Sequence, residues 1–175
     1  MSLEARDDAQ LVTEARLGSR EAAGELFSRH WRAAWRTAHA ITGSTVAAED
    51  VVQDSFERAF RALPRFDGRR PFGAWLHRIV VNRALTLLRD ERRLVSLETI
   101  EEPSIEQAEA LDRDLLVAVA GLPPERRVVV ILRYGLGHSL AEVAELMDIP
   151  VGTVQSRLAR ALAELRARLE VSDVE

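Results

Sequence analysis

Apolar residues recur at helical spacing along nearly the whole chain. In the stretch 19–41 they fall three and four positions apart, which places them on one face of an α-helix. Capping residues, glycines and prolines separate such stretches. The pattern predicts helices over about 8–18, 19–41, 46–63, 71–93, 112–120, 124–135 and 140–147, and a longer one from about residue 152.

One apolar run allows a second interpretation. The residues VVVIL at 128–132 have the composition of a buried strand. However, the sequence offers no second strand to pair with them, and the preceding Pro-Pro-Glu is typical of a helix start. We therefore expect a helix here as well, and the fold class is predicted to be all-α with two small helical domains.

The two domains are separated by an acidic segment. Residues 94–113 contain one proline and no aromatic residue, so we expect a solvated linker with at most one short helix. The linker would join a first domain at 1–93 to a second domain at 114–175. Fully extended, it would reach roughly 65–70 Å at about 3.3–3.6 Å per residue.

Charge is distributed unevenly along the chain. The net charge of −4 over 175 residues argues by itself against a nucleic-acid-binding protein. However, residues 58–93 hold ten arginines and three acidic residues, whereas residues 94–125 hold one arginine and eight acidic residues. A local positive block can neutralise phosphates while the rest of the chain keeps the protein soluble.

Composition also restricts the environment of the protein. The chain has no cysteine, which excludes disulfides and thiolate zinc sites and is consistent with a reducing compartment. The acidic N-terminal segment lacks the apolar stretch of a signal peptide. The longest aliphatic run is too short to span a bilayer. We therefore expect a cytoplasmic protein without membrane insertion.

The second domain contains a helix-turn-helix pattern. Ser139 and Glu142 form the capping box S-x-x-E before a short apolar helix, and the turn DIPVG leads into a longer amphipathic helix. In this arrangement the second helix enters the major groove of DNA and its first residues meet base edges. The alternative is an ordinary solvated helix face. We expect DNA contacts from the polar face, namely Thr153, Gln155, Ser156, Arg157 and Arg160.

Two long segments resemble one protein family. The second domain contains LPPERRVVVILRYGLGHSLAEVAELMDIPVGTVQSRLARALAELR, and the first contains AAEDVVQDSFERAFRALPRF followed by FGAWLHRIVVNRALTLLRDERR. Together they resemble bacterial RNA polymerase sigma factors of the extracytoplasmic-function (ECF) group within the sigma-70 family. One departure is Thr86, where the family often has Asp, so a role for that carboxylate does not carry over to this chain.

The resemblance implies how this chain acts. A sigma-2-like bundle would bind core RNA polymerase and read and melt the −10 promoter element, and a sigma-4-like helix-turn-helix would read the −35 element. These elements lie about two helical turns apart, roughly 70 Å at about 34–36 Å per turn, which the acidic linker could nearly span. The chain itself would have no catalytic residues, and the polymerase would carry out the chemistry.

The basic block is where the resemblance places −10 recognition. Single-stranded DNA is held by a positive groove with aromatic pockets for unstacked bases. Each residue also has a purely structural interpretation. Phe66 could only fill the junction between two helices, and Asn82 could be a buried polar group. Trp75 is expected in the core. The residues implied in −10 contacts are Phe66, Asp67, Arg69, Arg70, Arg78 and Asn82.

A third group of residues lies on the helix at 46–63. The resemblance places the acidic and polar face of this helix against the clamp coiled coil of the polymerase β′ subunit. Acidic and amide residues spaced by three and four positions share one helix face. A solvated acidic face is the common alternative, and a metal site is a weaker one. The residues of this face are Asp50, Gln53, Asp54 and Glu57.

The expected partners follow from the same resemblance. They are core RNA polymerase, through the β′ clamp coiled coil and the β flap, promoter DNA, and an anti-sigma factor. No cofactor, metal or small-molecule substrate is expected. The main alternative is a stand-alone helix-turn-helix regulator, which should dimerise on two half-sites, although the sequence shows no dimerisation heptad. A helical-bundle enzyme is disfavoured because the sequence lacks a paired acid–base set and a glycine-rich phosphate loop.

Overall fold

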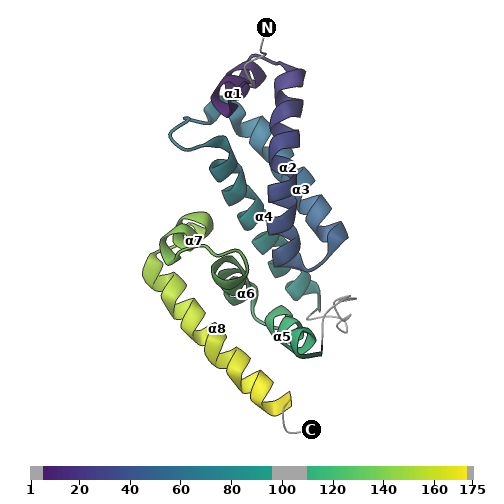
Figure 1. Ribbon diagram of the computed structural model, residues 1–175, viewed down its shortest axis with the longest axis vertical. Coiled ribbons are helices and arrows are strands. Elements are labelled where there is room, and N and C mark those ends of the chain that lie inside the picture. Colours follow the sequence, from purple (N-terminus) through teal and green to yellow (C-terminus); the bar gives the residue numbers. More distant parts are fainter. Residues whose placement is uncertain (1–5, 96–109, 173–175) are drawn as a thin grey trace.

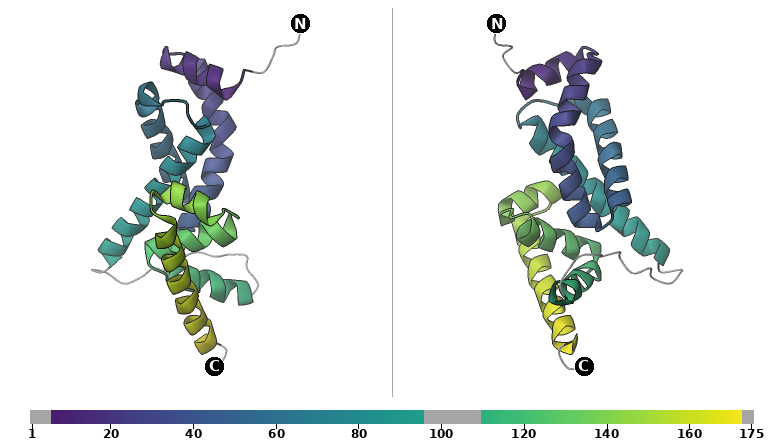
Figure 2. Two further views of the ribbon diagram at one scale, coloured as in Figure 1. Left: turned by 90° about the vertical axis from the view of Figure 1, so that its left-hand side faces the viewer. Right: turned by 45° about the vertical axis from the view of Figure 1, so that its right-hand side comes forward.

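The computed structural model describes residues 6–95 and 110–172 (Figures 1 and 2). Within these residues every regular element is helical and there is no strand, so the all-α prediction is confirmed. Most of the segment expected to be a linker, residues 96–109, lies outside the described residues. In Figure 1 the first domain is above and the second is below.

Side-chain caps begin three helices of the first domain, and those of the first two helices agree with the sequence pattern. The side chains of Asp7, Ser19 and Ser44 each accept a hydrogen bond from a backbone N–H three residues later. A left-handed Gly43, with φ of 73°, ends the second helix. The elements are α1 (Asp8–Arg16), α2 (Arg20–Thr42), α3 (Thr45–Ala62), the 3₁₀ turn η1 (Leu63–Arg65) and α4 (Phe72–Val95).

Helices α2, α3 and α4 pack pairwise around the core of the first domain. This core consists of fully buried aliphatic and aromatic side chains, which include Leu26, Ile41, Val51, Val52, Phe72, Leu76 and Val80. Helix α1 packs on α2 at one end of the bundle. There Arg6 pairs with Glu14 at 3.0 Å and with Glu25 at 2.6 Å.

The helices of the second domain follow the predicted order. Its first helix starts at residue 110 instead of 112, and the run at 128–132 is helical, with a final π turn that ends at Gly135 as predicted. The capping box is present, since Ser139 N–H donates to the Glu142 carboxylate at 2.7 Å. The elements are α5 (Ala110–Ala120), α6 (Pro124–Val130), η2 (Ile131–Gly135), α7 (Leu140–Met147) and α8 (Val151–Ser172).

Helix α8 is held by its apolar side, as the spacing predicts. Val154, Ala161 and Leu165 are buried, and α8 packs against α5, α6 and α7. Val143 and Met147 of α7 are buried as well. The opposite side of α8 therefore remains available for other contacts.

The two domains touch along α4, which packs against α6 and α7. Arg127 of α6 donates to the carbonyl of Thr42 at 2.9 Å, at the C-terminal end of α2, where the helix dipole favours a cation. Burial lowers the pKa of Arg127, although Glu91 of α4 opposes that shift. Nearby, Arg89 of α4 pairs with Glu125 of α6 at 2.7 Å.

Two histidines also meet across the domain boundary. The rings of His77 on α4 and His138, just before α7, lie 5.2 Å apart between centroids. His77 Nε2 hydrogen-bonds the hydroxyl of Thr37 on α2 at 3.2 Å. Burial, followed by the effect of His138, lowers the pKa of His77 from 6.5 to about 4. His77 is therefore neutral at pH 7 while the domains touch.

Lowering the pH from about 7.5 to about 5.5 should weaken the contact between the domains. Separating the domains removes the part of the pKa depression that comes from the second domain, so the stability that the neutral ring gives to the contact is complete above pH 6.5 and is lost toward pH 4. The ratio of open to closed chains should rise by up to about tenfold. Fluorescence energy transfer between dyes on Ser28→Cys and Ala167→Cys measures this ratio.

The chain has no native cysteine, so the two introduced thiols are the only labelling sites. Positions 28 and 167 are exposed and lie in different domains. The variant His77→Asn removes the titrating ring and should show little pH dependence. An equal response in wild type and His77→Asn would contradict the assignment to this residue.

Candidate nucleic-acid interface

The loop between η1 and α4 is shaped by one of its own acidic residues. Asp67 Oδ1 accepts a hydrogen bond from the backbone N–H of Arg69 at 3.0 Å, and Asp67 Oδ2 lies 3.4 Å from Arg69 Nε. Gly68 between them has φ of 70°, a conformation that glycine adopts without strain. Asp67 therefore holds the loop in a tight turn and leaves the arginines on its outer side.

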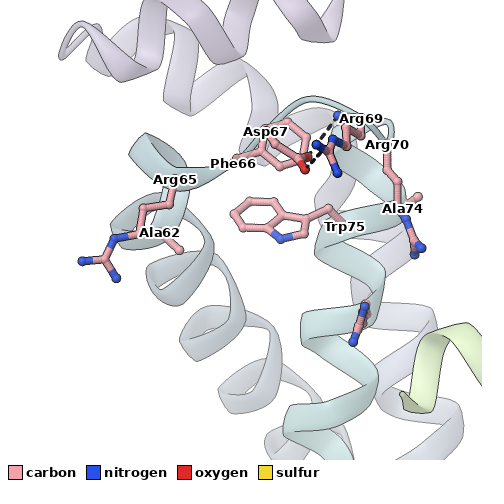
Figure 3. Close-up of a pocket in the computed structure, with 9 residues that line it drawn as sticks. Ala62, Arg65, Phe66, Asp67, Arg69, Arg70, Ala74 and Trp75 are labelled. Carbon is pink, nitrogen blue, oxygen red and sulfur yellow. Dashed lines mark hydrogen bonds and ion pairs between the residues drawn. The ribbon is translucent and has the colours of Figure 1, made fainter. Parts of the chain in front are cut away.

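A pocket of about 510 Å³ opens beside this loop (Figure 3). The rings of Phe66 and Trp75 form its apolar part, with centroids 4.7 Å apart and an interplanar angle of 33°. Four of the lining residues are arginines, so the rim is strongly positive. The lining residues are Ala62, Arg65, Phe66, Asp67, Arg69, Arg70, Ala74, Trp75 and Arg78.

Phe66 fills a helix junction and also lines this pocket. Its side chain is buried, and its ring meets the ring of Phe72 edge-on at 6.3 Å. Trp75, expected in the core, is only half-buried and lines the pocket. An aromatic surface edged by guanidinium groups has the chemistry to stack an unpaired base and hold its phosphates.

Sequence reasoning missed a residue that supports the pocket. Arg16 at the end of α1 donates from Nε to the carbonyl of Leu63 at 3.0 Å. Its guanidinium carbon lies 5.9 Å from the centre of the Phe66 ring, within the range of a cation–π contact. No local motif could reveal this role, because Arg16 is far from the loop in the sequence.

The predicted −10 residues on α4 face the second domain. Arg78 pairs with Asp148 at 2.7 Å, beyond the last turn of α7. The amide nitrogen of Asn82 donates to the carbonyl of Arg78 at 2.9 Å and to that of Leu146 at 3.2 Å. Asn82 is thus a satisfied, half-buried polar group in this structure, and the structure does not gather it into the pocket.

The predicted −35 residues lie in the first three turns of α8. Gln155, Ser156 and Arg160 are exposed, whereas Thr153 and Arg157 are half-buried. The hydroxyl of Ser156 donates to the carbonyl of Thr153 at 3.0 Å. The structure therefore places these five residues along the N-terminal half of one helix, three of them exposed and two of them partly covered.

The acidic face of α3 divides into two parts. Asp50, Gln53 and Glu57 are exposed, but Asp54 binds the guanidinium groups of both Arg58 and Arg83. Partial burial raises the pKa of Asp54, yet these hydrogen bonds outweigh it and hold the pKa below its usual range. Asp54 therefore links α3 to α4, whereas Asp50, Gln53 and Glu57 stay exposed, with Glu57 3.9 Å from Arg61 on the same helix.

Thr86, where the family often has Asp, makes a hydrogen bond within α4. The hydroxyl of Thr86 donates to the carbonyl of Asn82 at 2.9 Å, within its own helix. Residues 6–95 and 110–172 hold no group of three or more side chains that could bind a metal ion. No helix in this part of the chain is long and apolar enough to cross a membrane.

Known proteins resemble this chain over most of its length. The family models described as "Sigma-70 region 2" and "Sigma-70, region 4" match residues 26–94 and 112–165. The chain is 36% identical to the ECF RNA polymerase sigma factor SigM of Mycobacterium tuberculosis, over 94% of this chain and 85% of that protein. It is 34% identical to the RNA polymerase sigma factor CnrH of Cupriavidus metallidurans, over 93% of this chain and 94% of CnrH.

Solved structures of sigma factors are also similar to this chain. The structure of CnrH in complex with the cytosolic domain of CnrY matches with a TM-score of 0.64 and 32% identity, over 94% of this chain and 97% of that one. The sigma factor RpoE of Bartonella quintana, in complex with the anti-sigma factor NepR, matches with a TM-score of 0.62 and 25% identity. That match covers 85% of this chain and 96% of RpoE.

Replacing the arginine behind the pocket should loosen the loop. Arg16→Gln removes the hydrogen bond to Leu63 and the cation beside Phe66. The free energy of unfolding should fall by about 1 kcal/mol. Urea denaturation followed by tryptophan fluorescence measures the change, with the exposed Arg20→Gln as a control of equal charge. Equal stabilities for the two variants would show that Arg16 does not support the loop.

Proposed function

This chain belongs to the sigma-70 family, as an RNA polymerase sigma factor of the ECF group, and on that premise we propose which of its faces meet promoter and polymerase. A sigma factor is a transcription initiation factor and not an enzyme by itself. It binds core RNA polymerase and directs it to promoters.

The first domain, residues 1–93, recognises and melts the −10 element in this proposal. The observation that supports it best is the pocket of Phe66 and Trp75, surrounded by arginines, in the most basic part of the chain. Removing a base from the stack costs a few kcal/mol, which stacking on an aromatic ring offsets at about 1–3 kcal/mol per base. Arg69 and Arg70 would hold the phosphates, and Asn82 would read a base edge.

The second domain, residues 114–175, reads the −35 element through α8. The exposed Gln155, Ser156 and Arg160 meet the duplex first, and Arg157 can offer its planar group to O6 and N7 of guanine. The segment at 94–113 joins the two domains. The apolar side of α8 is fully occupied by packing, so the helix has one side for the protein and one for DNA.

Polymerase binding is assigned to α3. Asp50, Gln53 and Glu57 form an exposed acidic and polar face, suited to the β′ clamp coiled coil, and the second domain would meet the β flap. We place the protein in the cytoplasm with the polymerase. An anti-sigma factor is a further partner, by analogy with the complexes of CnrH with CnrY and of RpoE with NepR.

Transcription in vitro with core polymerase on genomic fragments tests this function. Starts that map downstream of a shared two-part sequence, and that depend on this protein, are the expected result. Tight binding of the isolated protein to duplex DNA, without an effect on polymerase, would instead indicate a stand-alone regulator.

Replacing Arg157 tests −35 reading. Arg157→Ala should weaken promoter binding by the holoenzyme by about 1–3 kcal/mol and relax the preference at a single position, if the guanidinium reads a base. Binding is measured on a panel of single-base promoter variants, with the exposed Arg166→Ala as a control far along α8. A uniform loss on every promoter would mean that Arg157 contacts phosphate only.

Replacing the exposed α3 residues tests polymerase binding. Asp50→Ala with Gln53→Ala should raise the Kd for core polymerase on the order of tenfold, since a few central residues dominate most interfaces. Thermal unfolding should be unchanged, because both side chains are exposed. The control is Asp114→Ala, an exposed carboxylate in the other domain. Unaltered binding would remove this face from the interface.

A further inference from the structure

Helix α1 contacts the loop that forms the proposed −10 pocket, although it precedes residues 26–94, the part of the chain matched by sigma-70 region 2. It packs on α2 and also contacts η1 and α4. In Figure 1, α1 and the loop that leads into α4 lie at the same end of the bundle. No residue of α1 lines the pocket, so any influence of α1 on the pocket passes through the loop.

The last turn of α1 supports the start of the loop. Arg16 Nε donates to the carbonyl of Leu63 at 3.0 Å, and the guanidinium carbon of Arg16 lies 5.9 Å from the centre of the Phe66 ring. Leu63 itself is buried in η1. One side chain of α1 therefore contacts both the backbone that precedes the loop and the aromatic ring of the pocket.

The first turn of α1 supports the other end of the loop through a histidine of α2. His30 Nε2 lies 2.7 Å from Asp8 Oδ2, and the ring centre of His30 lies 5.3 Å from that of Phe72. A Cβ atom at Gly73 would lie 2.8 Å from the same ring, so His30 packs directly against the backbone where α4 begins. Phe72 in turn meets the ring of Phe66 edge-on.

Charged groups hold α1 in place on α2. Arg6, just before α1, pairs with Glu14 of α1 at 3.0 Å and with Glu25 of α2 at 2.6 Å. Arg29 of α2 pairs with Asp8 at 3.1 Å. The apolar side of α1 is buried in the core of the first domain. Both ends of α1 are therefore fixed relative to α2 before any DNA arrives.

The loop depends on such supports because its own residues make few contacts. Residues 67–71 are exposed, and the hydrogen bond from the Arg69 N–H to Asp67 lies within the loop. The flanking Phe66 and Phe72 are buried. A pocket that is formed before its ligand binds loses less binding free energy to the ordering of a loop.

We propose that α1 is a positioning element of the −10 pocket. Arg16 and the pair formed by Asp8 and His30 hold the two ends of the loop, so that the ring of Phe66 meets an unstacked base without rearrangement. This inference rests on the proposed −10 role of the pocket. Arg16 acts through Phe66 and the loop, not through a contact with DNA.

Capture of a base is measured as the ratio of two affinities of the holoenzyme. One DNA is a promoter mapped by transcription in vitro, with its −10 element left single-stranded on the non-template strand. The other is the same DNA with one −10 base removed, at each position in turn. Fluorescence anisotropy of labelled DNA gives both Kd values. At the captured position, base removal should weaken wild-type binding about tenfold, the order expected for one stacked base.

The two ends of α1 are tested by Arg16→Gln and by Asp8→Ala, which releases His30. Each variant should bind the intact DNA about fivefold more weakly and the abasic DNA as wild type does, so the tenfold ratio falls to about twofold. Arg16→Lys keeps a cation and a donor and should retain most of the wild-type ratio. Arg20→Gln, the control of equal charge at an exposed position, should retain all of it.

Two results would overturn the positioning role. An undiminished ratio in either variant would show that this end of α1 does not act on the pocket, and an equal loss on intact and abasic DNA would show a general weakening of the domain. Failure of the −10 role is recognised separately, since removal of a base would then weaken wild-type binding at no position.

Discussion

Helix α4 makes contacts on two sides, and the placement of both faces proposed to meet DNA depends on this. Its apolar side, with Leu76 and Val80, completes the core of the first domain. Its polar side carries Arg78 and Asn82, which meet the second domain in this structure. Packing fixes the apolar side of α4 in the first domain, so the polar side of α4 has one orientation relative to that domain. In this orientation the polar side is either covered by α7 or available to nucleic acid.

The charge distribution makes such an exchange possible. A basic block exposed in an otherwise acidic chain attracts the chain's own carboxylates, and Glu125, Glu145 and Asp148 of the second domain each pair with an arginine of the first. DNA offers a denser row of negative charge than these three groups. Surface pairs of this kind hold the domains together without making the separation costly.

Local signals in the sequence predicted most of the fold, because caps and apolar spacing act within a few residues. Asp7, Ser19 and the Ser139–Glu142 box begin helices where expected. The role of Arg16 behind Phe66 and the pairing of Asp54 with Arg83 depend on tertiary contacts, which no spacing rule reveals. The contact of α7 with α4 was unpredictable for the same reason, since it joins residues that are 64 to 75 positions apart in the sequence.

The central claim is that α4 and α8 of one chain read two promoter elements about two helical turns apart, so the two domains separate when the polymerase holds them on a promoter. Energy transfer between dyes at positions 28 and 167 tests it most directly, measured on the free protein and on the complete promoter complex with core polymerase. The account predicts high transfer for the free protein and low transfer in the complex. Equal transfer in the two states would contradict it, because the domains would then read promoters without separating.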